Sequence, residues 1–149
     1  MADQRGPIVS PQMYRDYIKP RHRRFFDMIH ASTRAKLLFH SCGSVYKLLP
    51  DFVDIGVDLI NPVQVSCSDM DTARLKREFG DDLGFWGAID SQEVLPHGTP
   101  EQVRAEVERR LHDLGPGGGY MLAAVHNLQH DVPVENICAL YDAARATAP

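Results

Sequence analysis

A histidine and a cysteine, separated by one residue, stand at the end of an apolar run in the segment LLFHSCGSVYKLL, residues 37–49. If the run is a β-strand, His40 and Cys42 point to the same side of it, because alternate side chains of a strand share a face. Zinc binds imidazole nitrogen and thiolate sulfur, and a catalytic zinc uses three protein ligands and keeps a fourth position open. The pair predicts a metal site that needs a third ligand. The alternative, an ordinary histidine and an inert cysteine at a strand end, stays open on spacing alone.

Two residues are candidates for the third ligand. His126 ends a later apolar run, and Cys67 lies in the loop after residues 57–64, whereas His130 is more remote. Cys138 falls in an amphipathic pattern with Ile137 and is expected to be a buried structural residue. On the residues alone, the third ligand beside His40 and Cys42 therefore stays open between His126 and Cys67.

Four apolar runs, each followed by an amphipathic pattern, indicate how these residues are positioned. The predicted strands cover residues 35–40, 57–64, 83–90 and 119–127, and the helices that follow them cover 45–56, 70–80, 99–115 and 133–146. An initial helix over 11–32 starts at the Ser10 cap and should kink at Pro20. Strands that are apolar throughout, alternating with amphipathic helices, favour a parallel α/β sheet. The glycine-rich run 115–119 precedes a strand, so we expect a tight turn there and no phosphate-binding loop.

Polar side chains gather at the carboxyl end of each predicted strand. Such ends converge on one face in both open sheets and closed barrels, which predicts an active-site face. We assign Asp90 and Gln64 to catalysis and Asn61, His126 and Asn127 to substrate binding, with Asn61, Gln64 and Asp90 also able to orient His40. For any one of these residues, capping a helix or satisfying a turn is the alternative.

Composition limits the class of protein. The chain has 149 residues, a formal net charge of -4 and three cysteines at irregular spacing, which suits one domain with reduced thiols. No run reaches the length of a transmembrane helix and no signal-peptide pattern is present, so we expect a soluble, cytoplasmic protein that does not bind membranes. One basic cluster, residues 19–26, is insufficient to predict nucleic-acid binding.

Several segments, in order, resemble blocks of a known family. The segments are RGPIVSPQMYRDYIKPRHRRFFDMIH, FHSCGSVYKLLPDFVDIGVDLINPVQ, FWGAIDSQEVLPHGTPEQV and GGGYMLAAVHNLQHDVPVENI. They are similar to the uroporphyrinogen decarboxylase superfamily, and most of all to its branch of corrinoid-dependent methyltransferases. The resemblance implies a TIM (β/α)8 barrel of which residues 1–149 form one partial domain, the C-terminal half, with one helix followed by four strand-helix units.

The resemblance also implies a chemistry. The methyltransferase branch holds zinc with a His-x-Cys pair, matched here by His40 and Cys42, and with a later cysteine, where this chain has His126. The zinc activates a thiol that accepts a methyl group from a corrinoid, which is a substrate or a partner-bound cofactor, or from a methylated substrate. In uroporphyrinogen decarboxylases a histidine at the late position contacts the tetrapyrrole, and the catalytic aspartate would lie upstream of Met1. A tetrapyrrole enzyme and a non-catalytic half-barrel remnant are therefore the alternatives.

A half barrel should expose two strand edges and the inner face of its sheet, which is an aggregation hazard unless they are covered. We expect either a homodimer that closes a ring or a complementing chain that supplies the N-terminal half. The small-molecule partners implied are a methyl donor and a thiol acceptor, or a tetrapyrrole.

Overall fold

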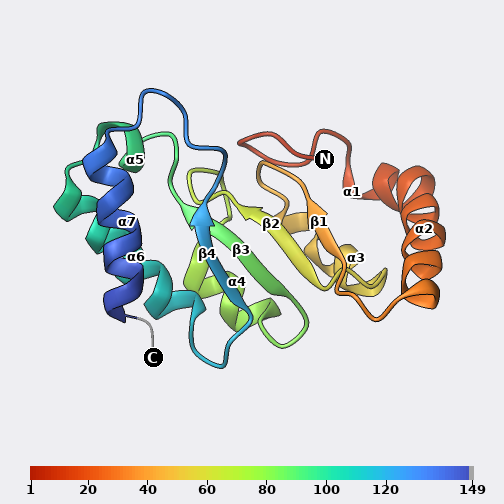
Figure 1. Cartoon of the computed structure of the whole chain (residues 1–149). Helices are drawn as coiled ribbons and strands as arrows, with labels where there is room; N and C mark the ends of the chain where they lie inside the picture. The colour runs from red at the N-terminus through yellow and green to blue at the C-terminus, as the bar shows by residue number, and fades with distance from the viewer. Residues whose placement is uncertain (148–149) are drawn as a thin grey trace.

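One sheet of four parallel strands, in the order β1-β2-β3-β4, forms the centre of the computed structural model, which describes residues 1–147. The strands are Leu38–His40 (β1), Leu59–Val63 (β2), Gly84–Ile89 (β3) and Tyr120–Ala124 (β4). Each lies inside a run predicted to be a strand, and Figure 1 shows them side by side. The predicted parallel α/β arrangement is confirmed.

Helices connect the strands as predicted, with local differences. The helices are Pro11–Met13 (α1), Lys19–Ser32 (α2), Leu49–Asp54 (α3), Thr72–Phe79 (α4), Val94–His97 (α5), Pro100–Leu114 (α6) and Val134–Thr147 (α7). A π-helical stretch, Tyr14–Ile18, joins α1 to α2 just before Pro20, the position of the predicted kink. A wider turn accommodates a proline that has no N–H to donate. The short helix α5 was not predicted, and a 3-10 turn, Tyr46–Leu48, precedes α3. No helix within residues 1–147 is long and apolar enough to cross a membrane.

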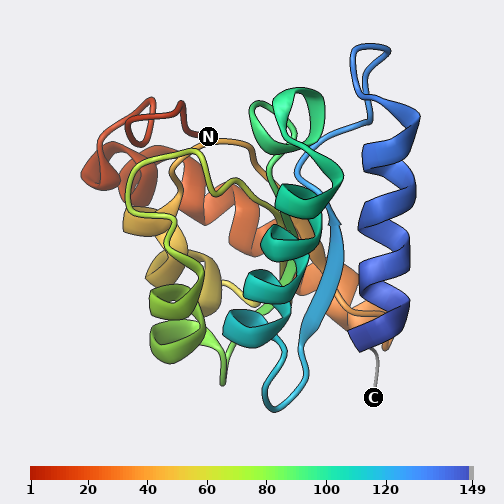
Figure 2. The same ribbon diagram turned by 90° about the vertical axis from the view of Figure 1, so that its left-hand side faces the viewer.

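One face of the sheet packs on helices. Phe39 of β1 contacts Phe26 of α2 and Phe52 of α3, with ring centroids 5.7 Å and 4.9 Å apart. A second apolar cluster joins α6 and α7 to the ends of β3 and β4. Figure 2 views the molecule from the side where α6 and α7 lie against each other. The core therefore lies entirely between the sheet and its helices.

The opposite face of the sheet has no helical cover within the described chain. The strand registers and the alternation along each strand place seven side chains on it, and we call these residues the uncovered face: Leu38, His40, Leu59, Asn61, Trp86, Met121 and Ala123. Leu38 and Met121 are 41% and 47% exposed although both are apolar. In Figure 1 this face lies between α2 and α7, which stand at the two sides of the sheet. An apolar sheet face open to solvent is the feature expected of half a barrel.

Helix α7 buries a different side from the one that the sequence pattern predicted. Its buried stripe consists of Asn136, Ala139, Leu140 and Ala143, and Cys138 is exposed, so the prediction that Cys138 is a core residue is wrong. The side-chain amide of Asn136 donates to the carbonyl oxygens of Leu95 and Gly98, both at 2.8 Å. A buried amide with two partners is tolerated in a core, and this anchor sets which side of α7 faces inward.

Asp51 ties α2 to α3. Its buried carboxylate accepts hydrogen bonds from the Arg15 guanidinium at 3.0 Å and from the Lys19 ammonium at 2.7 Å, and Lys19 also contacts Asp54 at 2.7 Å. Burial by itself would raise the pKa of Asp51, but the two cations outweigh burial and hold this pKa below its usual value. The folded state therefore favours the ionised carboxylate.

We expect Asp51→Asn to lower the free energy of unfolding at pH 7 by about 1–3 kcal/mol, because two cations lose their shared charged partner. The pKa of Asp51 is lower in the folded protein than in the unfolded chain, where it is near 3.8. Asp51 therefore contributes fully to the free energy of unfolding above the unfolded-chain pKa, and this contribution is lost as the pH falls through the pKa of the folded protein. The difference between wild type and variant should thus shrink below about pH 4.

Urea unfolding at several pH values measures this difference. Asp54→Asn is the matched control, because the Asp54 side chain is 54% exposed and surface pairs contribute only about 0–1 kcal/mol. Equal losses for the two variants would contradict the assignment of Asp51 as the main tie.

Candidate functional site

His40 and Asn61 are direct neighbours across β1 and β2 in the strand register. The His40 Nδ1 atom lies 2.7 Å from the Asn61 side-chain oxygen. An amide oxygen can only accept, so Nδ1 carries the proton and Nε2 keeps its lone pair. The Nε2 atom lies 3.5 Å from the Cys42 Sγ atom. The register thus fixes the imidazole in the tautomer that can bind a metal through Nε2.

The separation of these two atoms suits two positions of a tetrahedral zinc site. A nitrogen at about 2.05 Å and a sulfur at about 2.3 Å from zinc, at a tetrahedral angle, are roughly 3.5 Å apart. The Cys42 side chain is partly buried and His40 is exposed, so both atoms are accessible. A hydrogen bond from the far ring nitrogen, as Asn61 receives here, is what orients histidine ligands in metal sites. The two residues and their supporting amide fit the predicted metal.

A third ligand is not assembled within residues 1–147. No group of three His, Cys, Asp or Glu side chains in this range is arranged to hold a metal ion. Cys67 is buried, and burial raises the pKa of its thiol, which disfavours the thiolate that a metal requires. His126 is exposed near His40 but is outside ligand distance of the pair. The role of His126 as third ligand therefore stays a prediction.

A cavity of about 370 Å³ opens at the carboxyl ends of the strands. Its lining contains the predicted metal ligand His40 and all three residues predicted to bind substrate, Asn61, His126 and Asn127. It also includes three residues that the sequence did not predict: Trp86, Ala124 and Val125. Trp86 was missed because β3 is apolar throughout, so nothing in its pattern distinguishes the helix-covered face from the open face. The convergence of strand ends brings the predicted polar residues of three strand-helix units into one site.

Gln64 and Asp90, the predicted catalytic residues, are engaged in holding loops. The Gln64 side-chain oxygen accepts the N–H of Gly43 at 2.8 Å, which fixes the loop that carries Cys42. Asp90 accepts the backbone N–H groups of Gln92 and Glu93 at 2.8 and 3.3 Å. Both side chains are buried and neither lines the cavity. These contacts are those of positioning residues, and a catalytic role for either residue stays a prediction.

The N-terminal strap, residues 1–7, crosses the loops that follow three of the strands. The Asp3 carbonyl accepts the N–H of Ser44 at 2.7 Å, and the Gln4 carbonyl accepts the N–H of Ser68 at 3.0 Å. The Gln4 side chain also donates to Gln92 at 3.1 Å. The strap thereby joins the loops after β1, β2 and β3 beside Cys42. No sequence pattern indicates it, because the contacts are made mainly by backbone groups.

Gly43 sits where the strap approaches the His-x-Cys loop most closely. Its φ is +94°, and a Cβ atom there would lie 2.6 Å from backbone atoms of Ala2 and Asp3. We expect Gly43→Ala to destabilise the protein by about 2–4 kcal/mol through backbone strain and overlap with the strap.

Gly117→Ala is the matched control for this substitution. Gly117 also has a positive φ, +75°, but a methyl group added there would have no atom within 4 Å, so only the backbone strain of about 1–2 kcal/mol remains. Thermal unfolding measures both losses, and hydrogen exchange at the Ser44 and Ser68 amides measures release of the strap. Unchanged exchange at these amides in Gly43→Ala would refute the proposed role of the strap contact.

A parallel sheet with crossover helices on one face and a polar cavity at the carboxyl ends of its strands is the architecture of a TIM-barrel protein, present here as four of the eight strand-helix units. The chain belongs to the uroporphyrinogen decarboxylase (URO-D) family, whose sequence profile matches residues 1–147. The predicted family and the predicted C-terminal half-barrel fold are both confirmed.

Individual relatives divide between two activities. The Methylated-thiol--coenzyme M methyltransferase of Methanosarcina mazei is 27% identical over 143 residues, covering 94% of this chain and 35% of that protein. The uroporphyrinogen decarboxylase of Psychromonas ingrahamii is 28% identical over 142 residues, covering 93% and 38%. A solved methyltransferase structure from M. mazei matches 93% of this chain and 38% of its own with a TM-score of 0.72 and 23% identity, which supports the fold. The chain thus spans little more than a third of the length of these relatives.

Proposed function

We propose that this chain forms the metal-binding half of a zinc-dependent methyltransferase, which moves a methyl group between a corrinoid or a methylated substrate and a thiol. The observation that carries the proposal is the 3.5 Å approach of His40 Nε2 to Cys42 Sγ, with the histidine tautomer fixed by Asn61. The similarity to a methylated-thiol methyltransferase over 94% of the chain supports the same function.

The residues of this chain would act as follows. His40 Nε2 and the Cys42 thiolate would hold the zinc, and Asn61 would keep the imidazole oriented. Bound zinc supplies the charge that turns a substrate thiol, whose ordinary pKa is about 8.5, into a thiolate nucleophile at neutral pH. Gln64 would act indirectly, as a positioning residue: it accepts the N–H of Gly43 and so fixes the loop that carries Cys42. Each of these roles rests on a contact between these side chains and their neighbours in the folded chain.

The cavity beside the pair would receive the second substrate. Its volume of about 370 Å³ lies within the range of roughly 300–1,000 Å³ found for small-molecule sites. Asn61 is occupied by His40, which leaves Trp86, His126 and Asn127 to contact the methyl donor. An apolar ring flanked by imidazole and amide groups suits a donor with both an apolar body and polar substituents.

A tetrapyrrole enzyme related to uroporphyrinogen decarboxylase is the second candidate. It is favoured by the position of His126 in the cavity and by the decarboxylases among the relatives. A third candidate is a half barrel that binds a partner without catalysis. His126→Ala separates the first two, because it should abolish tetrapyrrole binding in a decarboxylase-like site but only weaken zinc binding, since His40 and Cys42 remain as ligands.

Zinc binding provides the first test. We expect purified protein supplied with zinc under reducing conditions to bind about one zinc per chain by elemental mass spectrometry. Cys42→Ser should lose this zinc, whereas Cys138→Ser should retain it, because Cys138 is exposed on α7 away from the site. Wild-type protein that binds no more zinc than Cys42→Ser would overturn the proposal.

The role of Asn61 is tested by a pair of variants. Asn61→Ala removes the acceptor that fixes the His40 tautomer, so zinc affinity should fall about 10- to 100-fold, as is typical of lost outer hydrogen bonds to a ligand. Asn61→Asp keeps an acceptor oxygen and should retain the affinity. Competition with a chromophoric chelator measures both, and equal affinities for Asn61→Ala and wild type would show that the hydrogen bond does not orient the ligand.

A further inference from the structure

We propose that the uncovered face, the two free sheet edges and one flank of α2 together bind a complementary α/β half that contains four parallel strands and three crossover helices, and that a second copy of this chain does not fit there. This inference goes beyond the proposed function, because it concerns assembly and holds whether or not the site binds zinc.

The sheet itself presents the first part of the surface. β1 and β4 are edge strands, each with one side unpaired within residues 1–147. Leu38, Trp86 and Met121 lie between these edges on the uncovered face. Unpaired parallel edges beside an apolar face form a template for further strands. Four strands that pair with both edges would close an eight-stranded barrel and bury these three side chains.

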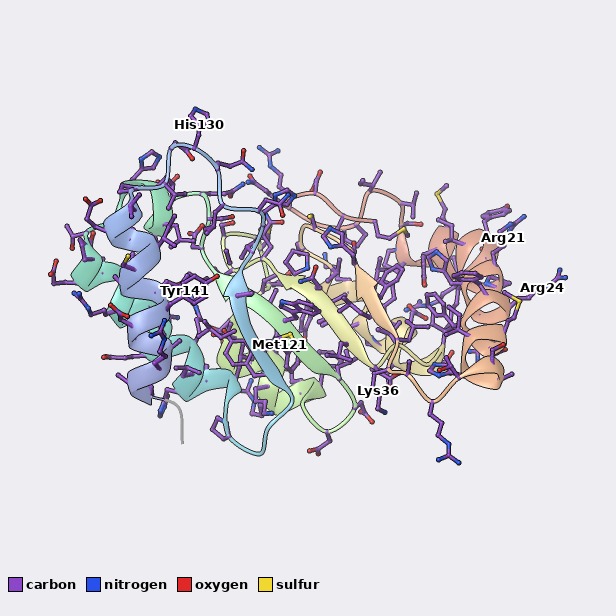
Figure 3. The ribbon with its side chains drawn as sticks, in the orientation of Figure 1. Arg21, Arg24, Lys36, Met121, His130 and Tyr141 are labelled. Atoms are coloured by element: carbon purple, nitrogen blue, oxygen red, sulfur yellow. The ribbon has the colours of Figure 1, made fainter. Side chains whose placement is uncertain are left out.

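One flank of α2 presents the second part. The other flank is engaged with α3 through the ion pairs of Lys19 and Arg23 with Asp54. The free flank carries a groove of about 600 Å³, which we call the α2 groove, lined by Arg21, Arg24, Phe25 and Met28. Figure 3 shows Arg21 and Arg24 pointing outward from the side of α2 remote from the sheet. Phe25 and Met28 are 55% and 57% exposed. The α2 groove therefore has an apolar surface bordered by the two arginines.

The number of helices decides which occupant fits. A (β/α)8 barrel has one crossover helix per strand, but this chain carries a helix both before β1 and after β4, because α2 packs on β1 through Phe26 and Phe39. Two copies would bring ten such helices to eight strands, counting α2, α3, α4, α6 and α7 of each. Packed helices need about 8–10 Å of separation, so α7 of one copy and α2 of the other would compete for a single position.

The complementary half is defined by the same count. Four strands joined by three helices complete the barrel with eight helices in all. The last of these three helices would be the neighbour of α2 and would lie in the α2 groove. Arg21 and Arg24 at the rim favour acidic side chains on that helix. Its sheet would place an apolar face opposite Trp86 and Met121.

The test is coexpression of the full 149-residue chain with a probe half, the segment of the M. mazei methyltransferase that lies N-terminal to the region matched here. We expect a 1:1 complex in which the emission of Trp86, the single tryptophan of this chain, shifts to shorter wavelength. A probe half with its own tryptophans replaced by phenylalanine keeps this signal specific. Met121→Lys on the uncovered face and Phe25→Lys in the α2 groove should each weaken the complex at least tenfold.

Ala105→Lys is the matched control, because Ala105 is exposed on α6, whose two neighbours α4 and α7 belong to this chain. It should leave the affinity unchanged. Absence of a complex, or a complex that neither test variant weakens, overturns the proposal. Sedimentation of the chain alone is a second measurement: a discrete dimer that shields Trp86 and dissociates on Met121→Lys would show that a second copy does fit. None of these outcomes changes the zinc measurements, so the two proposals fail separately.

Discussion

The in-register parallel pairing of β1 with β2 is the interaction on which the rest of the site depends. It sets His40 beside Asn61, so that one hydrogen bond of 2.7 Å both aligns the ring and selects its tautomer. A shift of one residue in this register would turn His40 toward the helices, because adjacent side chains of a strand face opposite ways. The free Nε2, its approach to Cys42 and the position of the cavity all follow from this alignment.

Polar groups around the site are used mainly to hold loops in place. Gln64 and Asp90 are buried and accept backbone N–H groups, and the carbonyl oxygens of the N-terminal strap accept others. Within the described chain, no buried side-chain nitrogen or oxygen lacks a partner. A buried polar group without a partner lowers the free energy of unfolding by about 1–3 kcal/mol. These hydrogen bonds therefore allow polar side chains to surround the site without destabilising the fold. His40, His126 and Asn127 are exposed and do not hold these loops, so they can face solvent or a ligand.

The uncovered face connects the fold to the chemistry. His40 and Asn61 lie on the same face as Leu38 and Met121, so whatever covers the apolar residues also closes one side of the site. Excluding water from such a site strengthens every charge interaction in it. Covering this face would therefore complete the core and enclose the candidate metal position at the same time.

The sequence by itself determined the strand-helix order and the parallel sheet, because hydrophobic periodicity is a local property. The two-residue repeat of a strand did not determine the approach of Cys42 to His40, because β1 ends at His40 and Cys42 lies in the loop that Gln64 holds. The sequence could not show that Cys138 points outward, since Asn136 finds its two carbonyl partners only in the folded chain. The position of Trp86 in the cavity could not be predicted, because a strand that is apolar throughout does not reveal which of its faces is open. The N-terminal strap could not be predicted either, because backbone contacts leave no pattern in residue types. Only the tertiary structure decided which polar strand ends face the cavity and which hold loops, since that choice depends on hydrogen-bond partners distant in sequence.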